Sequence, residues 1–317
     1  MRRIPIAGLV ALALAGALDA SASARPGDRI RAALAARMVR DDGPDQIAPG
    51  ETLRYGADPA QSLSFWHARG VSGPAPLIVY VHGGGWSRGS KDNATGRWKV
   101  EHFPGEGYAF ATIDYRLVPG ATVEDEAADV AHALKALLDR AAALGIDRTR
   151  VVLMGHSAGA HLVALVGTDE WYLRAAGLSF GTLAGVIPID GAAYDVPAQM
   201  ADGPGIMQQT YRAAFGTDPV RQRALSPTLA ARAHPFGSAS VPGSAPHFLL
   251  LHVQRPDGVR QAEALETALQ AAGAPVERAG FEGTGLKGHM TINRKLGDPD
   301  YLATGAVDRW LKRLFSR

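Results

Sequence analysis

The chain has 317 residues, of which 46% are hydrophobic and 20% are charged, and its formal net charge at pH 7 is +2. This length and hydrophobic content suit one large globular domain or two small ones, and they exclude disorder as the dominant state. Because the chain has no Cys, disulfide scaffolds, thiol nucleophiles and Cys-ligated metal sites are excluded. The nearly balanced charge provides no strong field for nucleic acid or an anionic membrane. We therefore expect a small, uncharged partner and no nucleic acid.

The first 24 residues have the pattern of a secretory signal peptide. Arg2 and Arg3 form a positive start, Ile4–Leu18 is an apolar run, and Ala22-Ser23-Ala24 provides a small-residue cleavage pattern. The apolar run is shorter than the roughly 20 residues of a membrane-spanning helix. We expect export to the periplasm or the medium, a mature chain from about Arg25, and no membrane span after signal removal.

Residues 25–317 are predicted to form a single domain, because no repeat, low-complexity tract or linker divides them. Their first part, 25–50, is expected to contain a helix over Asp28–Val39 and then a polar loop with Asp41, Asp42 and Asp45. These three residues lack the spacing of a calcium loop, so a solvated loop is the ordinary interpretation. The helix is a candidate cap over a functional site.

Short apolar runs alternate with longer Ala-rich runs along the rest of the chain, which predicts a mostly parallel sheet with helices on both faces. We expect strands at Leu77–Val81, Tyr108–Ile113, Val151–Met154, Gly185–Ile189, Phe248–His252 and Pro275–Phe281. We expect helices at Val123–Leu144, Ala158–Gly167, Val259–Ala272 and Tyr301–Phe315. Within residues 191–243 only Ile206–Phe215 has a helical pattern, and this segment either shapes a pocket or is plain loop.

A Gly-x-Ser-x-Gly motif, Gly155-His156-Ser157-Ala158-Gly159, stands between an expected strand and an expected helix. This is the context in which the motif forms a sharp turn that exposes the serine hydroxyl. The turn strains the serine backbone, and neighbouring chains can approach only where positions 155 and 159 lack side chains. In a chain with 37 Gly the motif alone is weak evidence, so its context carries the prediction that Ser157 is a nucleophile.

A second Gly-rich motif supports this prediction. The strand Leu77–Val81 runs directly into His82-Gly83-Gly84-Gly85-Trp86. Such a turn leaves backbone N–H groups bare, so that they can converge on a developing oxyanion. The alternative is a flexible turn without a chemical role.

With these motifs the chain resembles the α/β-hydrolase fold, and within it the hormone-sensitive-lipase-like carboxylesterases and the neighbouring feruloyl-esterase-like and kynurenine-formamidase-like enzymes. The resemblance extends from about Tyr55 to the C-terminus. Besides the two Gly motifs it rests on Tyr55–Pro59, Asp114–Leu117, Leu225–Pro227 and Gly288–Met290. It implies that the backbone N–H groups of Gly84, Gly85 and Ala158 form the oxyanion hole, and that His82 is structural.

The resemblance also implies a Ser-acid-His triad in that chain order. The acid is expected after the seventh strand, where Asp257 stands, and Asp190 after the preceding strand is kept as the alternative. For either aspartate the ordinary interpretation is a helix cap or a turn residue. The base is expected to be His289, which follows the last predicted strand in a Gly-rich loop.

The remaining candidates concern the pocket. Trp86 directly follows the oxyanion glycines and is expected near the acyl side of the pocket, unless it packs into the wall. His156, which precedes the elbow serine, is the second candidate pocket residue. Of the other histidines, His161 is expected to pack inside, and His102, His132 and His234 to lie at the surface. No histidine pair has a familiar metal-ligand spacing, so we expect no metal and no other cofactor.

The sequence therefore predicts an exported serine carboxylesterase that acts on small, acetyl or aryl esters. Two alternatives stay open, namely an arylformamidase-like amidase, which would share the same catalytic parts, and a hydrolase-like binding protein that has lost its chemistry.

Overall fold

The computed structural model describes residues 49–237 and 245–316, and these belong to one compact unit. The expected signal peptide and the candidate cap helix over residues 28–39 lie outside the described residues, as do the acidic residues at 41, 42 and 45. The structure described below therefore concerns the part of the chain that carries the two Gly-rich motifs and the candidate triad.

An eight-stranded sheet with the order β1-β2-β4-β3-β5-β6-β7-β8 forms the centre of the described residues. Its strands are β1 Glu51–Arg54, β2 Ser62–Trp66, β3 Ala75–Val81, β4 Ala109–Ile113, β5 Ile146–His156, β6 Gly185–Ile189, β7 His247–Gln254 and β8 Val276–Thr284. The β1–β2 and β2–β4 pairs are antiparallel, and every other neighbouring pair is parallel. The six strands expected from the sequence are all present, and the expected α/β class is confirmed.

The central strands are apolar throughout because both faces of the sheet are covered. Every residue of β3 is buried. Leu77, Val79 and Val81 pack into one hydrophobic core, while Ile78 and Tyr80 pack into a second core on the opposite face. This alternation explains the continuous apolar runs, since a strand of a parallel sheet has no face for water.

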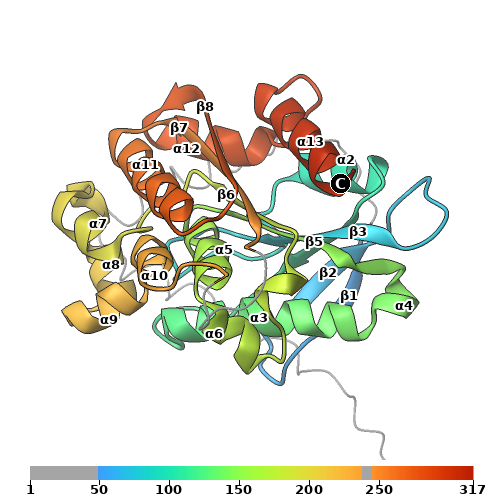
Figure 1. Ribbon diagram of the computed structural model, residues 1–317, viewed down its shortest axis with the longest axis horizontal. Coiled ribbons are helices and arrows are strands. Elements are labelled where there is room, and N and C mark those ends of the chain that lie inside the picture. Colours follow the sequence, from blue (N-terminus) through green and yellow to red (C-terminus); the bar gives the residue numbers. More distant parts are fainter. Residues whose placement is uncertain (1–48, 238–244, 317) are drawn as a thin grey trace, which may run out of the picture. The chain divides into compact units, whose positions relative to one another are not determined.

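Helices cover both faces of the sheet (Figure 1). One core takes side chains from α3 Val123–Asp139, α5 Ala158–Thr168 and α11 Pro256–Ala271. The other core takes side chains from α2 Arg97–Gly105, α12 Gly285–Lys295 and α13 Leu302–Phe315. The remaining short elements near α3 are α4 Ala141–Leu144, α6 Glu170–Ala175 and a 3₁₀ turn at Phe180–Thr182. The single helix expected over 123–144 is thus two helices, α3 and α4.

The segment after β6 holds more helix than the sequence predicted. It contains α7 Val196–Asp202, a 3₁₀ turn at Gly205–Met207, α8 Gln208–Phe215, α9 Pro219–Ala224 and α10 Pro227–Ala233. These helices gather beside α5 and α11 (Figure 1). Tyr211 and Phe215 of α8 are buried in the core that contains α5. Residues 196–233 therefore form an ordered group of helices that packs on the core, and they are not a plain loop.

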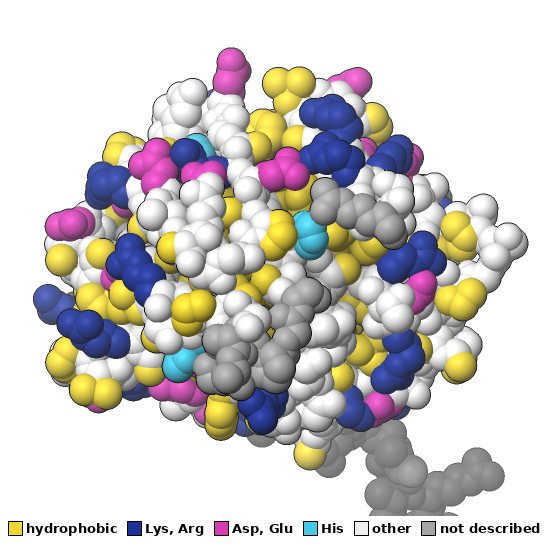
Figure 2. Space-filling model, viewed as in Figure 1, with side chains coloured by type: hydrophobic (Ala, Val, Ile, Leu, Met, Phe, Trp, Pro, Cys, Tyr) yellow, Lys and Arg dark blue, Asp and Glu magenta, His cyan; other side chains and the backbone are white. Residues whose placement is uncertain are grey.

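Charged side chains of both signs are spread over the face of the molecule shown in Figure 2. The view shows basic and acidic groups interspersed, in keeping with the nearly balanced composition of the chain. Within the described residues no helix is both long and apolar enough to cross a membrane.

Candidate functional site

Ser157 lies at the sharp turn between β5 and α5. Its backbone has φ 56° and ψ −116°, in the positive-φ region where non-glycine residues are strained. A Cβ added to Gly155 would lie 2.3 Å from the carbonyl oxygen of Gly159, and one added to Gly159 would lie 2.1 Å from the carbonyl oxygen of Val81. Both glycines are thus required by close backbone approach, and the expected strand–turn–helix elbow is confirmed.

The side chains of Ser157 and His289 meet although 132 residues separate them. The Oγ of Ser157 lies 3.0 Å from Nε2 of His289, which is hydrogen-bond distance for a nucleophile and its base. The sequence pattern predicts a loop at His289, but His289 lies in helix α12. The glycines that suggested a loop are explained by packing, because a Cβ on Gly288 would lie 2.5 Å from the carbonyl carbon of Gly283.

The partner of His289 is Asp190 and not Asp257, which corrects the first choice made from the sequence. The Nδ1–H of His289 donates to Oδ2 of Asp190 at 2.6 Å. Asp190 directly follows β6, its side chain is fully buried, and its backbone φ of 43° is strained. Its position at the end of the strand next to β5 brings it beneath the histidine. The alternative that the sequence left open is therefore the one the structure supports.

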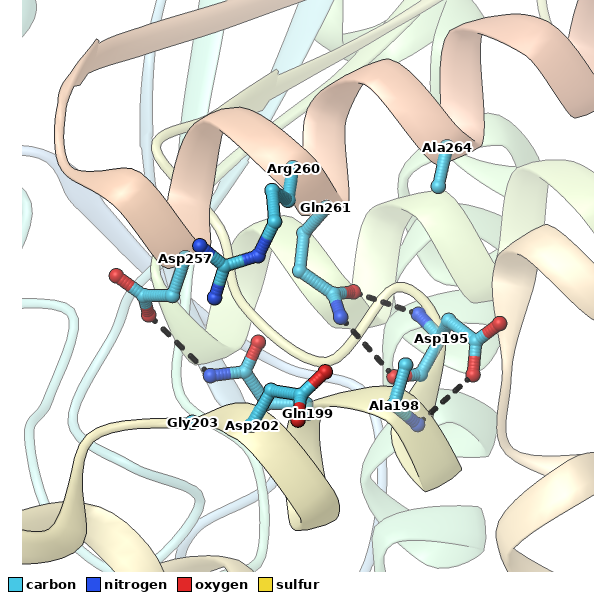
Figure 3. Close-up of a pocket in the computed structure, with 9 residues that line it drawn as sticks. All are labelled: Asp195, Ala198, Gln199, Asp202, Gly203, Asp257, Arg260, Gln261 and Ala264. Carbon is cyan, nitrogen blue, oxygen red and sulfur yellow. Dashed lines mark hydrogen bonds between the residues drawn. The ribbon is translucent and has the colours of Figure 1, made fainter.

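Asp257 has another environment, in the first turn of α11. Its Oδ2 accepts hydrogen bonds from Nε2 of Gln199 at 3.2 Å and from Nη1 of Arg255 at 3.4 Å. Figure 3 shows its carboxylate turned toward Gln199 of α7, at one end of a pocket of about 200 Å³ between α7 and α11. Asp257 follows Pro256 at the start of a helix, where an acidic residue is stabilised by the helix N-terminus. The Pro256-Asp257 pair at the start of a helix is thus the sequence pattern that indicated a structural role for Asp257.

The charge of Asp190 is stabilised by several neighbours. Burial by itself raises the pKa of this carboxyl, but the hydrogen bond from His289, the charges of His289 and Arg255, and the backbone N–H of Val253 together hold it well below its usual range. The N–H of Val253 donates to Oδ1 at 3.1 Å. Asp190 is thus ionised at any pH near neutrality, as an acid that orients a histidine must be.

His156 packs directly against His289, so the structure places this candidate pocket residue beside the base. The two rings lie 4.4 Å apart between centroids, and Nε2–H of His156 donates to the carbonyl oxygen of His289 at 2.9 Å. Burial, followed by the proximity of His289, lowers the pKa of His156 well below its usual value. His156 is therefore neutral and supports the backbone of the base.

The Gly-rich loop after β3 lies against the elbow. A Cβ added to Gly83 would lie 2.9 Å from Cβ of Ser157, and one added to Gly84 would lie 1.8 Å from the carbonyl oxygen of Arg88. Gly84 and Gly85 have φ values of 139° and 62°, which only glycine adopts readily. Among the backbone hydrogen bonds of the described loops, none uses the N–H of Gly84 or Gly85, so both donors are available to a ligand.

The Trp86 ring packs into the wall instead of lining an open pocket. Only 2% of the residue is exposed, and its ring contacts Phe215 and His161 at centroid distances of 4.7 and 5.5 Å. Its Nε1–H donates to Nδ1 of His161 at 3.3 Å, and Nε2–H of His161 donates to the carbonyl oxygen of Leu225 at 2.8 Å. Of the two interpretations of Trp86, packing into the wall is the one the structure supports, and His161 packs inside as expected.

The other histidines lie away from this site. His82 is fully buried and its ring stacks on Tyr115 at 4.4 Å, in keeping with the structural role that the resemblance implied. His132 and His234 are exposed as expected, whereas His102 is mostly buried and its Nε2 lies 2.8 Å from Oδ1 of Asp308. Within the described residues no group of three or more His, Asp and Glu side chains is arranged to hold a metal ion.

Comparisons with known proteins point to esterases. The BD-FAE family model matches residues 63–174, a stretch that contains the Gly-rich loop and Ser157 but neither Asp190 nor His289. The chain is 34% identical over 110 residues to a probable isoprenylcysteine alpha-carbonyl methylesterase of Oryza sativa subsp. japonica, covering 35% of this chain and 26% of that protein. It is 34% identical over 114 residues to the esterase LipC of Mycobacterium tuberculosis, covering 36% and 28%.

A relative named for a different activity matches a stretch of similar length. The chain is 32% identical over 114 residues to a kynurenine formamidase of Drosophila melanogaster, covering 36% of each chain. All three of these matches thus span only about a quarter to a third of the relatives' own length. Among solved structures, esterase B from Lactobacillus rhamnosis superimposes with a TM-score of 0.71 at 21% identity, covering 90% of this chain and 93% of that one. This similarity extends the shared fold to nearly the whole chain.

Proposed function

We propose that this chain, which has the α/β-hydrolase fold, is a serine carboxylesterase with Ser157 as nucleophile, His289 as base and Asp190 as the orienting acid. One observation carries the proposal, namely the unbroken line of contacts from Ser157 Oγ to His289 Nε2 and from His289 Nδ1 to Asp190 Oδ2, at 3.0 and 2.6 Å. The three residues follow in the chain order Ser, acid, His that this fold uses, and the similarity to relatives named as esterases supports the reaction class.

The reaction then proceeds in two halves. His289 removes the proton of Ser157 as Oγ attacks the ester carbonyl, while Asp190 stabilises the imidazolium that forms. The N–H groups of Gly84, Gly85 and Ala158 hold the oxyanion. The tetrahedral species expels the alcohol, which takes the proton from His289, and leaves an acyl group on Ser157. Water activated by the same histidine attacks this acyl-enzyme and releases the acid.

We further propose that the acyl group is small or flat. The wall beside the oxyanion loop is aromatic and closely packed, since Trp86 is held between Phe215 and His161. A Cβ added to Gly85 would lie 2.9 Å from the methyl group of Thr210, so α8 also lies close to the loop. These contacts favour acetyl over long-chain esters, and turnover of p-nitrophenyl acetate should exceed that of p-nitrophenyl octanoate at equal subsaturating concentrations.

The kinetic test compares wild type with Ser157→Ala and His289→Ala on p-nitrophenyl acetate. Each variant should lose on the order of 10⁴-fold or more in kcat, as other triads do. Exposed His132→Ala is the matched control for His289→Ala and should keep wild-type turnover. Near-wild-type turnover by either triad variant would refute the assignment.

An arylformamidase-like amidase is the second candidate, supported by the match to a kynurenine formamidase over a stretch of similar length. The same Ser157, His289 and Asp190 would serve both reactions. Comparing kcat/KM on formanilide and on phenyl formate, each divided by the rate of uncatalysed hydrolysis, separates the two, because the division removes the greater intrinsic reactivity of the ester. A larger rate enhancement for the ester supports the carboxylesterase, and a larger one for formanilide supports the amidase.

A hydrolase-like binding protein without activity is the third candidate. The complete contact line of Ser157, His289 and Asp190 argues against it, since loss of chemistry relieves the need to keep all three.

We also propose that the chain is exported with residues 1–24 removed. N-terminal sequencing of the protein from the periplasm or the medium should then begin near Arg25, and a start at Met1 would contradict export by cleavage.

A further inference from the structure

Arg255 links the two aspartates between which the sequence left the choice of acid open. It follows β7, and its side chain is only 13% exposed. Its Nε donates to Oδ2 of Asp190 at 2.9 Å, and its Nη1 donates to Oδ2 of Asp257 at 3.4 Å. Its Nη2 donates to the carbonyl oxygens of Asp190 and Gly191, both at 3.3 Å. One nearly buried guanidinium thus contacts both the side chain and the backbone of the residue that orients His289.

One carboxylate oxygen of Asp190 accepts hydrogen bonds from both His289 and Arg255. Oδ2 accepts Nδ1–H of His289 at 2.6 Å and Nε–H of Arg255 at 2.9 Å. A guanidinium this close stabilises the carboxylate and offsets part of the negative potential that the imidazole would otherwise feel. Arg255 therefore limits how strongly Asp190 holds a proton on His289, and the backbone hydrogen bonds fix the strained turn at Asp190.

Asp257 balances Arg255 from the other side. Burial disfavours the charge of Arg255, but the charges of Asp190 and Asp257 outweigh burial and raise its pKa above the usual value. Asp257 is itself held in place by Gln199 at 3.2 Å (Figure 3). The arrangement is a row of three charges, negative at Asp257, positive at Arg255 and negative at Asp190, with the catalytic histidine at its end.

The other ionisable groups near this row leave its charges dominant. Those that face the row or His289 from neighbouring elements are Lys99 of α2, His156 of β5, Tyr194 after β6, Tyr211 of α8 and Tyr301 before α13. Those that share α12 with His289 are Lys287, Arg294 and Lys295. Burial keeps His156 and Tyr194 neutral, and it raises the pKa of Tyr301 to about 12. Lys99 is directed to oxygens of Asn293, and Lys287 is exposed.

We propose that Arg255 is a positioning residue for the reaction proposed above, which fixes Asp190 against His289 and offsets part of the negative charge that faces His289, with Asp257 as the counter-charge of Arg255. The inference rests on the proposed function. It assigns Asp257 to the same machinery in a different role from the one the sequence suggested, because Asp257 acts on the base only through Arg255.

The test is the pH dependence of kcat/KM on p-nitrophenyl acetate for Arg255→Met, Arg255→Lys and Asp257→Asn. The acid limb of the profile should move up by about one pH unit in Arg255→Met, because two carboxylates then face His289 without their cation. It should move down by a few tenths of a unit in Asp257→Asn, since Arg255 then acts on Asp190 alone. Arg255→Lys keeps the charge but loses the fork, so its profile should stay near wild type while kcat falls several-fold.

Asp202→Asn is the matched control for Asp257→Asn. Asp202 lines the same pocket but is exposed, and in the part of the chain that the structure describes it makes no ion pair with Arg255. The acid limb of this variant should coincide with that of wild type. A shift as large as that of Asp257→Asn would mean that general charge near the pocket, and not the row through Arg255, sets the profile.

A second readout needs no activity. The ¹³Cε1 NMR resonance of His289, assigned by its loss in His289→Gln, should titrate at higher pH in Arg255→Met and at lower pH in Asp257→Asn. Unshifted titrations, or shifts in the same direction, overturn the inference. If Arg255→Met does not fold, a downward shift in Asp257→Asn with an unshifted Arg255→Lys supports the inference, and an upward or absent shift in Asp257→Asn overturns it. If wild-type protein has no turnover that disappears in Ser157→Ala, the proposed function is refuted, while the NMR titration of His289 still tests the role of Arg255.

Discussion

Asp190 and Asp257 show how one side chain's surroundings decide its role. Asp190 lies under His289 in a strained turn with φ 43°, whereas Asp257 faces α7 from the first turn of α11. The resemblance to related esterases favoured Asp257 because it counts strands, and a strand count cannot show which carboxylate points at the base. The local signal was present in the sequence, because Pro256-Asp257 is typical of a helix start and Ile189-Asp190-Gly191 of a strand that ends in a turn.

The two aspartates should therefore differ sharply in activity. Asp190→Asn keeps the shape but leaves His289 without the carboxylate that fixes its tautomer, so kcat on p-nitrophenyl acetate should fall on the order of 10⁴-fold. Asp257→Asn should lose less than about tenfold, because it contacts the base only through Arg255. Equal losses in the two variants would contradict the assignment of Asp190.

Glu126 is a buried acid that the proposed reaction does not use. Burial, with the nearby charge of Asp129, raises its pKa to about 9 against the weaker opposing effect of the Val118 backbone. The folded protein thus binds a proton that the unfolded chain releases above about pH 4.5, so this group costs stability progressively as the pH rises toward 9.

Glu126→Gln mimics the protonated acid and should remove this loss. Its free energy of unfolding should exceed that of wild type by about 2–4 kcal/mol at pH 8 and by much less at pH 5. Urea denaturation of both proteins at the two pH values measures the difference. Exposed Glu282→Gln is the control and should show no gain at either pH. A Glu126→Gln gain that does not grow with pH would show that the acid is ionised in the fold.

At the scale of elements, helix α12 carries His289 and is tied to α2 through one buried lysine. Lys99 is fully buried and donates to the backbone oxygen of Asn293, to its Oδ1 at 2.9 Å, and to the carbonyl oxygen of Thr95 at 2.7 Å. Asn293 lies one turn after His289, on the same face of the helix. The position of the base thus depends on a contact between two helices that the sequence analysis did not identify.

Lys99→Met should therefore reduce both stability and activity. Loss of these hydrogen bonds leaves the backbone carbonyl oxygens of Asn293 and Thr95 without the lysine donor, which costs about 2–4 kcal/mol, and a displaced α12 should lower kcat on p-nitrophenyl acetate. Lys295→Met is the control on the same helix, since that lysine is partly exposed and makes one long ion pair of 3.9 Å, and the substitution should cost less than about 0.5 kcal/mol. Wild-type stability of Lys99→Met would mean that the lysine does not hold the helix.

The elements that the sequence predicts are buried and continuously apolar, whereas the elements that it misses are exposed or begin among many Gly and Pro residues. Strands such as β3 and β6 are apolar on both faces, and a continuous apolar run marks them. The edge strand β1 is largely exposed and has no such run. Helices α9 and α10 each begin with Pro after Asp218 or Ser226, a helix-start pattern hidden among many Gly and Pro. α12 was missed because it contains two glycines, of which Gly288 packs closely against Gly283 and Gly285 has a positive φ of 55° at the helix start.

Acid should destabilise the whole molecule, because three histidines are buried in the neutral form. Burial lowers the pKa of His161 to about 4, and it also lowers the pKa of His82 and of His156. Below about pH 6.5 the unfolded chain therefore binds protons that the folded protein does not. Stability is present above that pH and is lost as the pH falls through the window from 6.5 toward 4.

Urea denaturation between pH 7 and pH 4 should follow this expectation. In Glu126→Gln, which removes the one opposing buried acid treated above, the free energy of unfolding should fall by up to about 1.4 kcal/mol per pH unit for each buried histidine. Adding His132→Gln, a change at an exposed histidine, should leave that slope unchanged. A free energy that stays flat between pH 6.5 and 4 would mean that these histidines protonate in the folded state.

Covalent labelling with a fluorophosphonate tests the central claim most directly, because the reagent reacts with a serine only where base and oxyanion donors are in place. Mass spectrometry of folded wild-type protein should find one phosphonyl adduct, on the peptide that contains Ser157. The adduct should be absent in Ser157→Ala, form slowly in Asp190→Asn, and form at close to the wild-type rate in Asp257→Asn. An unlabelled wild-type protein, or an adduct elsewhere with Ser157 unmodified, would contradict the account.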